Sequence, residues 1–339
     1  MAFQARRENR PTTAGLDGTV VILESGDGKA RAEVSPANGF NCFRWLAERD
    51  GHMLDLLYAD PQFFQGAKPT RSGVPILFPF PNRIRDGRFV WNGREYQLPL
   101  NDSTMKNAIH GFACRRPWRV VDEGGDGHCA WVTGEFRGSV DAPDCSHLWP
   151  ADYQIRVTVR LGAASLEIAA VVSNPDRVPL PFGLGYHPYF RIPPGLNEAP
   201  EKLFIRASAD RYWVLAESLP TGTTLPVAAR LDLREPRRFR ELELDDVLQN
   251  PGGPEKPGSL RWQGSVYAEE GKTELLRVEA SPALRELVVF TPPHRQAICL
   301  EPYTCTTDAI NLQQRGVDAG LIVLQPGEEW RGDVVLRLV

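Results

Sequence analysis

The sequence has little that would direct it to a membrane or to nucleic acid. No apolar run reaches about 18 residues, the length that a membrane-spanning helix needs. The opening residues MAFQARRENR carry charges where a secretory signal requires an apolar segment. No run of lysine and arginine resembles a nucleic-acid-binding arm, and a net charge of -4 gives no long-range attraction for phosphate backbones or anionic lipid. We therefore expect a cytoplasmic protein that binds neither nucleic acid nor membranes.

Cysteine is scarce, and its spacing excludes the usual metal motifs. The six cysteines include no CxxC pair and no zinc-finger spacing. Reduced cysteines behave as small apolar side chains in a cytosolic core. We expect no metal site, and free buried thiols at Cys42, Cys114, Cys129, Cys145, Cys299 and Cys305.

Helical periodicity is nearly absent, and only residues 306–316 could form a short helix. Folds built from βαβ units need a crossover helix after each strand, so they are disfavoured. Apolar residues alternate with polar ones instead, which is typical of half-buried strands. With 42% hydrophobic residues the chain can bury a sizeable core. We expect an all-β protein, a large antiparallel β-sandwich that forms one domain over residues 1–339.

Two hairpins are predicted from local sequence. Residues 153–161 and 166–172 each place their apolar side chains on one face, with the turn GAAS between them. Asn92 and Gly93 lie between two alternating arms and suit the positive φ angles of a two-residue type I′ turn. Further strands are predicted in TVVILES, ARAEVSP, FNCFRWLAE, KLFIRAS, ELVVFTP, AICLEP and the C-terminal pair within residues 320–339.

Four segments combine reactive side chains with a restrained backbone. Asn82 and Arg83 follow a proline-rich stretch and offer the donors and the acceptor that a polyhydroxyl ligand needs. His110 precedes a glycine, which permits a close backbone approach. His187 lies within PLPFGLGYHPYFRI, where turns and aromatic packing fix its direction, as a general acid requires. Glu301 ends an apolar strand, where a carboxylate is costly to bury unless it is used or paired.

Each of these residues also has an ordinary structural interpretation. Arg83 could lie on the surface beside a turn, and Glu301 could reach solvent at the end of its strand. Either histidine could be a core residue whose ring nitrogens are both hydrogen-bonded. Taken one at a time, the four segments leave these alternatives open.

Taken together in this order, the segments resemble the aldose 1-epimerase (mutarotase) family. The resemblance rests on NRI at 82–84, HG at 110–111, GYHPYF at 185–190, LPTG at 219–222, LDDV at 244–247 and EPYTCTTDAIN at 301–311. It implies a large antiparallel β-sandwich that holds a monosaccharide in an open cleft on one sheet, without a metal or cofactor. We expect a monomer or a weak homodimer.

The resemblance also implies roles for single residues. Glu301 matches the general base that removes the proton from the C1 hydroxyl, and His187 matches the general acid that protonates the ring oxygen. His110 matches a second histidine near the ring oxygen. The substrate-binding residues would be Arg83, Asp245 and Asn82. An ordinary Glu is ionised at neutral pH and an ordinary His is partly protonated, so the two could interconvert the anomers of a free aldohexose from opposite sides of the sugar.

Other substrates and functions remain open. Arg191 stands where galactose mutarotases have Asn, which weakens the case for galactose. As in hexose-6-phosphate 1-epimerases, a sugar phosphate could be held by Arg85, Arg88, Arg115 and Arg116. A non-catalytic carbohydrate-binding protein on the same scaffold would need Arg83 and Asp245 but neither Glu301 nor His187. A glycoside hydrolase or lyase on a similar sandwich is a further alternative; hydrolysis would need a second carboxylate beside Glu301, which Asp245 could supply.

Overall fold

The computed structural model describes residues 2–13, 15, 17–195, 202–249, 258–268 and 271–339. In these ranges the chain is mostly strand, with two short α-helices, α1 (Gly138–Asp141) and α2 (Ala309–Gln314). The helix predicted within 306–316 is confirmed, whereas α1 was not foreseen. Its single turn is held by Asp141, whose carboxylate accepts the backbone N–H of Arg137 at 2.7 Å. None of the described helices is long and apolar enough to cross a membrane.

Three large antiparallel sheets make up the fold. The five-stranded sheet is a meander of β1 (Gln4–Asn9), β2 (Thr19–Glu24), β3 (Ala30–Ser35), β4 (Asn41–Arg49) and β5 (His52–Asp55). The nine-stranded sheet has the order β11 (Arg119–Gly125), β12 (Ala130–Arg137), β13 (Gln154–Leu161), β14 (Ser165–Ser173), β28 (Glu329–Leu338), β24 (Thr273–Ala280), β23 (Arg261–Ala268), β18 (Phe204–Ala207) and β21 (Arg237–Arg238).

The eight-stranded sheet carries the candidate site. Its order is β20 (Leu219–Pro226), β19 (Arg211–Ala216), β22 (Asp245–Gln249), β25 (Glu286–Phe290), β26 (Ala297–Tyr303), β16 (Gly185–Tyr186) and β6 (Ile76–Leu77), and β17 (Tyr189–Arg191) also pairs with β26. Three two-stranded ribbons complete the described part: β7 (Arg83–Ile84) with β10 (Ala108–Ile109), β8 (Arg88–Trp91) with β9 (Arg94–Gln97), and β15 (Leu180–Phe182) with β27 (Ile322–Leu324).

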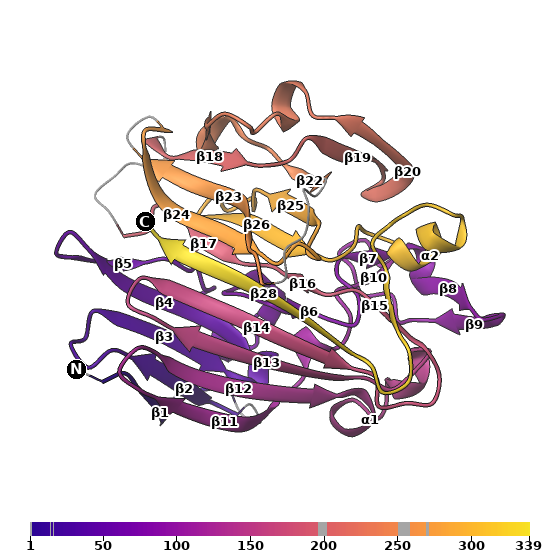
Figure 1. The fold of residues 1–339 in the computed structure, drawn as a ribbon, viewed down its shortest axis with the longest axis horizontal. Coiled ribbons are helices and arrows are strands. Elements are labelled where there is room, and N and C mark those ends of the chain that lie inside the picture. Colours follow the sequence, from indigo (N-terminus) through magenta and orange to yellow (C-terminus); the bar gives the residue numbers. More distant parts are fainter. Residues whose placement is uncertain (1, 14, 16, 196–201, 250–257, 269–270) are drawn as a thin grey trace.

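The sheets form a sandwich in which the nine-stranded sheet packs against both other large sheets. Its strands β12 and β13 contact β2, and β23 contacts β26. Figure 1 shows the nine-stranded sheet running from β11 to β18 against the indigo five-stranded sheet and the orange strands of the eight-stranded sheet. A common core contains Trp45 from β4, Ile155 from β13 and Leu300 from β26. The predicted antiparallel β-sandwich is confirmed.

Both predicted hairpins are present. Strands β13 and β14 pair from Gln154 with Ser173 to Leu161 with Leu166, and β14 alternates strictly between buried and partly exposed side chains. Strands β8 and β9 are joined by Asn92 and Gly93, whose φ angles are 48° and 78°. Local alternation and turn chemistry were therefore sufficient to predict these two units.

The alternation of β25 and β26 determines which side chains reach the site. Ile298 and Leu300 on β26 belong to the core between the sheets. The intervening residues Cys299, Glu301 and Tyr303 therefore point to the opposite face, since successive side chains of a strand alternate. The segment AICLEPY reads as a continuous buried strand, but only one of its faces belongs to that core.

The six cysteines are all free, as predicted. Burial holds for four of them, whereas Cys129 and Cys145 are partly exposed. Cys129 immediately precedes β12, and Cys145 lies between α1 and β13, so neither has an opposing sheet to cover it completely. The prediction of burial is thus wrong for these two thiols.

Candidate active site

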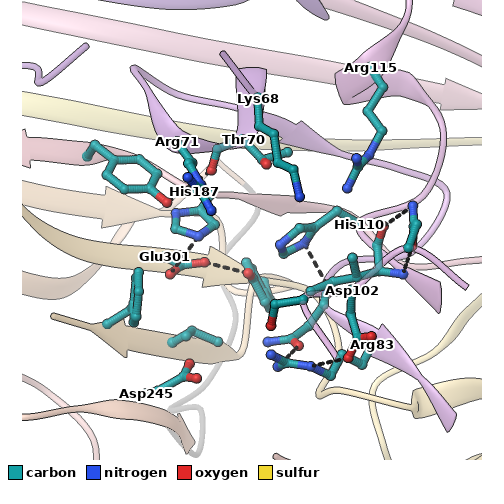
Figure 2. Close-up of a pocket in the computed structure, with 18 residues that line it drawn as sticks. Lys68, Thr70, Arg71, Arg83, Asp102, His110, Arg115, His187, Asp245 and Glu301 are labelled. Atoms are coloured by element: carbon teal, nitrogen blue, oxygen red, sulfur yellow. Dashed lines mark hydrogen bonds and ion pairs between the residues drawn. The ribbon is translucent and has the colours of Figure 1, made fainter. Parts of the chain in front are cut away.

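A cleft of about 210 Å³ lies on the outer face of the eight-stranded sheet. Its floor comes from the alternate residues of the central strands, including Val288, Phe290, Glu301 and Tyr303. Loops that precede β6 and follow β9 form the walls. All six residues predicted for the site line this cleft: Asn82, Arg83, His110, His187, Asp245 and Glu301. Figure 2 labels all of them except Asn82 and shows how the labelled side chains converge from separate elements.

Glu301 and His187 are in direct contact at the base of the cleft. His187 Nε2 lies 3.4 Å from Glu301 Oε1, and the Tyr303 hydroxyl donates a hydrogen bond to Glu301 Oε2. Only 1% of Glu301 and 6% of His187 is exposed. The sequence analysis placed the two on opposite sides of a sugar, but 3.4 Å leaves no room for a ring between them. Both groups must therefore approach a ligand from the same side.

The backbone and aromatic neighbours hold His187 firmly. Its ring stacks on Tyr189 with centroids 4.6 Å apart and planes 4° from parallel, and Phe290 contacts it edge-on at 6.1 Å. Its backbone N–H donates to Pro75 O at 3.1 Å. Gly185 allows the approach of β16 to β26, because a Cβ there would lie 2.4 Å from the Tyr303 ring. The aromatic packing expected around this histidine is present.

Burial acts on the two partners in opposite directions. It raises the pKa of Glu301 well above its usual range, although the hydrogen bond from Tyr303 opposes this shift. It lowers the pKa of His187 to about 3. Each isolated charge is thus disfavoured, while each charge stabilises the other across 3.4 Å. Burial thus favours the neutral form of each group and leaves the one proton of the pair on Glu301, unlike the ionised Glu and partly protonated His that the sequence analysis assumed.

The opposite wall presents hydrogen-bond donors to the cleft. The backbone N–H of Asn82 donates to His110 Nδ1 at 3.3 Å, so the proton of the neutral ring is on Nε2. Burial, followed by the nearby His187, lowers the pKa of His110 well below its usual value and keeps the ring neutral. Arg83 donates to Asn82 Oδ1 at 3.1 Å, and its Nε is 3.6 Å from Asp102. This network directs the guanidinium along the wall.

The two adjacent aspartates of β22 have different environments. Asp245 is exposed and lines the cleft beside Phe290, its partner across the sheet. The Asp246 carboxylate accepts two hydrogen bonds from Arg230, at 2.6 and 2.9 Å. The choice of Asp245 over Asp246 therefore agrees with the direction of the side chains, as strand alternation requires.

Three positively charged side chains also line the cleft, and the sequence analysis considered only one of them, Arg115. Lys68, Arg71 and Arg115 line the cleft on the side of the two histidines (Figure 2). No ion pair joins any of the three to an acidic residue within the described ranges. Lys68 and Arg71 precede the proline-rich stretch, and the segment KPTR was the available signal. It was missed because Pro69–Arg71 form a single turn of 3₁₀ helix, which is too short for a periodicity that reveals the direction of its side chains.

The other arginines proposed for a phosphate are engaged elsewhere. Arg88 pairs with Glu95 within the β8–β9 hairpin, and Arg116 contacts Asp144 at 2.5 Å. The Nε of Arg85 lies 4.0 Å from Asp308. None of these three lines the cleft, so only Arg115 remains of the four predicted candidates.

A third residue with metal-binding chemistry adjoins the Glu301–His187 pair. The Cys299 sulfur, one ring nitrogen of His187 and one Glu301 oxygen all lie within 4.8 Å of one another. Among the described residues these are the ones that could hold a metal ion together.

The aldose 1-epimerase family model matches residues 45–337, and the chain belongs to this family. The uncharacterised Escherichia coli protein YphB is 27% identical over 284 residues, covering 80% of this chain and 86% of YphB. Galactose mutarotase of Rattus norvegicus is 28% identical over 178 residues, which is 50% of this chain and 46% of the rat protein. A galactose mutarotase-like protein from Clostridium acetobutylicum has the same fold, with a TM-score of 0.85, 21% identity, and coverage of 99% of this chain and 98% of its own.

Proposed function

We propose that the protein is an aldose 1-epimerase that interconverts the α and β anomers of an aldohexose. Membership of the family and the similarity to rat galactose mutarotase support an epimerase. The observation that carries the proposal is the contact between a buried carboxylate and a buried imidazole at the base of an open cleft. Neither residue would need this contact in a protein that only bound sugar.

In the proposed reaction the pair moves one proton without changing its own charge. The proton of the pair first passes from Glu301 to His187 across 3.4 Å. Ionised Glu301 then takes the proton from the C1 hydroxyl, while protonated His187 gives its proton to the ring oxygen as the bond from C1 to that oxygen breaks. Glu301 is then neutral, His187 is neutral, and the sugar is an open-chain aldehyde. Rotation about the C1–C2 bond and the reverse transfers close the ring on the other face. Because the total charge of the buried pair stays constant, no step requires a new isolated charge in a dry site.

The short distance within the pair fits this chemistry. The C1 hydroxyl and the ring oxygen are bonded to the same carbon, so one acid and one base on the same side can reach both. Proton transfer requires the donor and acceptor atoms to lie within about 2.6–3.2 Å in a defined direction. The stacking of His187 on Tyr189 fixes the direction of the imidazole. His110 Nε2–H, Arg83 and Asp245 are the proposed contacts to sugar oxygens.

Polarimetry on freshly dissolved α-D-glucose and α-D-galactose tests the proposal. We expect accelerated mutarotation that is nearly lost in Glu301→Gln and His187→Asn, with circular dichroism unchanged. A wild-type rate equal to that of buffer for every aldose and sugar phosphate tested would remove the proposed activity.

We also propose a second candidate substrate class, hexose 6-phosphates, for the same reaction. Lys68, Arg71 and Arg115 supply three cations to one wall of the cleft, and arginine and lysine are the usual partners of phosphate. A protein of Cenchrus ciliaris to which glucose-6-phosphate 1-epimerase activity has been provisionally ascribed is 23% identical over 294 residues. If this class is correct, Arg71→Gln raises KM for glucose 6-phosphate but not for glucose. Arg116→Gln, whose pair lies outside the cleft, is the matched control.

A further inference from the structure

The cluster of Cys299, His187 and Glu301 follows from the register of β17 and β26. Cys299 and Glu301 are two residues apart on β26 and therefore share a face. Tyr189 on β17 pairs with Cys299, which places His187, two residues earlier, beside both. All three side chains are buried. A nitrogen, a sulfur and an oxygen thus converge below the cleft floor, from positions fixed by the sheet rather than by mobile loops.

The spacing of the three donors is close to that of a metal site. Zinc binds thiolate at about 2.3 Å and imidazole or carboxylate at about 2.0–2.2 Å, so donors around a tetrahedral ion are roughly 3.3–3.8 Å apart. His187 Nε2 and Glu301 Oε1 are already 3.4 Å apart, and the whole set lies within 4.8 Å. Because Tyr189 and Phe290 hold the His187 ring, the remaining gap is left to the Cys299 and Glu301 side chains. His187 Nδ1 is buried and has no hydrogen-bond partner among the described residues, so this nitrogen is not committed to another group.

We propose that His187, Cys299 and Glu301 form an inhibitory binding site for a thiophilic divalent cation such as Zn²⁺. Sulfur and imidazole donors favour zinc over magnesium or calcium, which prefer oxygen. Three protein ligands leave a fourth position open toward the cleft for water or a hydroxyl group. The Cys299 thiol and the single proton of the Glu301–His187 pair supply two protons that leave as the ion binds, and no oxidation or reduction occurs. The bound ion occupies both the acid and the base, so proton transfer stops.

Binding can be measured without reference to the proposed reaction. Titration of the full-length protein with Co²⁺ should give one equivalent of a tetrahedral cobalt spectrum with a thiolate-to-metal charge-transfer band, which Zn²⁺ then removes. X-ray absorption of the zinc-loaded wild type should show one sulfur ligand at about 2.3 Å with nitrogen or oxygen ligands at about 2.0 Å. A wild-type zinc shell without sulfur would overturn the proposal, and this measurement needs no variant.

Cysteine variants test whether Cys299 supplies the sulfur ligand. Cys299→Ser should lose the charge-transfer band and bind Zn²⁺ at least about 10-fold more weakly, with Cys299→Ala as a second variant should the first misfold. Cys305→Ser is the matched control, because Cys305 is equally buried and free but belongs to no potential metal group among the described residues. The control should keep both the band and the affinity. Equal cobalt spectra in wild type and Cys299→Ser would refute the site.

Inhibition is the second readout. Micromolar Zn²⁺ should slow mutarotation, EDTA should reverse the effect, and Mg²⁺ should have none. The half-inhibitory concentration should rise at least about 10-fold in Cys299→Ser and stay unchanged in Cys305→Ser. A cobalt band without any epimerase activity would leave the metal site standing while the proposed function fails. Activity that Zn²⁺ does not inhibit would refute the inhibitory site alone.

Discussion

Two buried carboxylates lie on neighbouring strands of the eight-stranded sheet, and only one of them lines the cleft. Glu286 on β25 is the register partner of Tyr303, while Glu301 on β26 is the partner of Val288. Burial raises the pKa of both, that of Glu286 to about 8. Glu286 accepts hydrogen bonds from Trp213 at 2.9 Å and Gln249 at 3.4 Å, and its Oε1 lies 3.5 Å from Arg285.

The difference between the two lies in their partners and not in their burial. Glu286 is surrounded by fixed donors in the packed region around Trp213. Glu301 instead contacts a titratable imidazole and borders open space. A perturbed pKa alone would have indicated both residues as candidates for catalysis. Glu301 is the better candidate, because it contacts the His187 imidazole and is open to a ligand in the cleft.

The largest expected effect separates the two carboxylates by activity. Glu301→Gln should lower the rate of mutarotation by about 10²- to 10⁴-fold, the usual contribution of a general base. Glu286→Gln should stay within a few-fold of wild type, because Glu286 touches neither the cleft nor His187. Polarimetry measures both, and circular dichroism establishes that each variant is folded. Similar losses in two folded variants would show that the comparison is wrong.

The pH dependence of stability should reveal the buried carboxyl of Glu286, although Glu286 has no role in the proposed reaction. A carboxyl with a pKa of about 8 when folded and about 4.5 when unfolded binds more protons in the native state between these values. The free energy of unfolding therefore falls as pH rises through this window, by at most about 1.4 kcal/mol per unit from this group. Glu286→Gln should remove this contribution.

Urea unfolding at pH 5 and pH 8 measures the effect. Glu301 shifts in the same direction, so wild type should keep losing stability with pH for a second reason. The difference between the wild-type and Glu286→Gln slopes of unfolding free energy against pH gives the contribution of Glu286. Parallel slopes would mean that Arg285 holds Glu286 ionised in the folded protein, against the direction that burial gives.

The structural features that could be predicted from the sequence are those determined by residues close together in the chain. The Asn92-Gly93 turn and the β14 alternation are set by adjacent residues, so they were predictable. The placement of Glu301 and His187 in one cleft followed from resemblance to a family. Their contact at 3.4 Å and the shared proton did not, because both result from the register of β16, β17 and β26.

Two features could not be inferred from sequence patterns. The sequence predicted a strand that contains Glu286, but not the burial of its side chain. That burial depends on Trp213 and Gln249, which are distant in sequence. Lys68 and Arg71 lie at the two ends of a 3₁₀ turn, which Asn41 and Tyr189 hold by hydrogen bonds to the backbone oxygens of Pro69 and Thr70. In both cases the decisive partner is non-local.

A smaller effect should come from Tyr303, which is the register partner of Glu286 and donates a hydrogen bond to Glu301. We infer that it is a positioning residue that acts through Glu301. Tyr303→Phe keeps the ring but removes the hydrogen bond to Glu301 Oε2. Because hydrogen bonds to charged groups contribute about 1.5–3 kcal/mol, kcat/KM should fall by roughly 10- to 100-fold. The pKa of Glu301 should also rise further, since this bond lowers it.

The pH profile distinguishes this role from a structural one. A Glu301–His187 pair that holds its proton more tightly loses it at higher pH. The alkaline limb of the kcat/KM profile should therefore shift to higher pH in Tyr303→Phe. Tyr186→Phe is the matched control, because the buried Tyr186 hydroxyl has no hydrogen-bond partner among the described residues. An unchanged profile in Tyr303→Phe, or an equal change in Tyr186→Phe, would contradict the role of Tyr303.

The smallest expected effect extends the comparison to the adjacent aspartates of β22. Asp245→Asn should raise KM for the sugar by about 2- to 10-fold, since one polar contact contributes about 0.5–1.5 kcal/mol. Asp246→Asn should leave KM unchanged and cost at most about 1 kcal/mol of stability, because its partner Arg230 is largely exposed. Initial rates and thermal unfolding of both variants provide the test. An increase in KM confined to Asp246→Asn would mean that β22 presents the opposite face to the sugar, and Asp245 would then lose its proposed role.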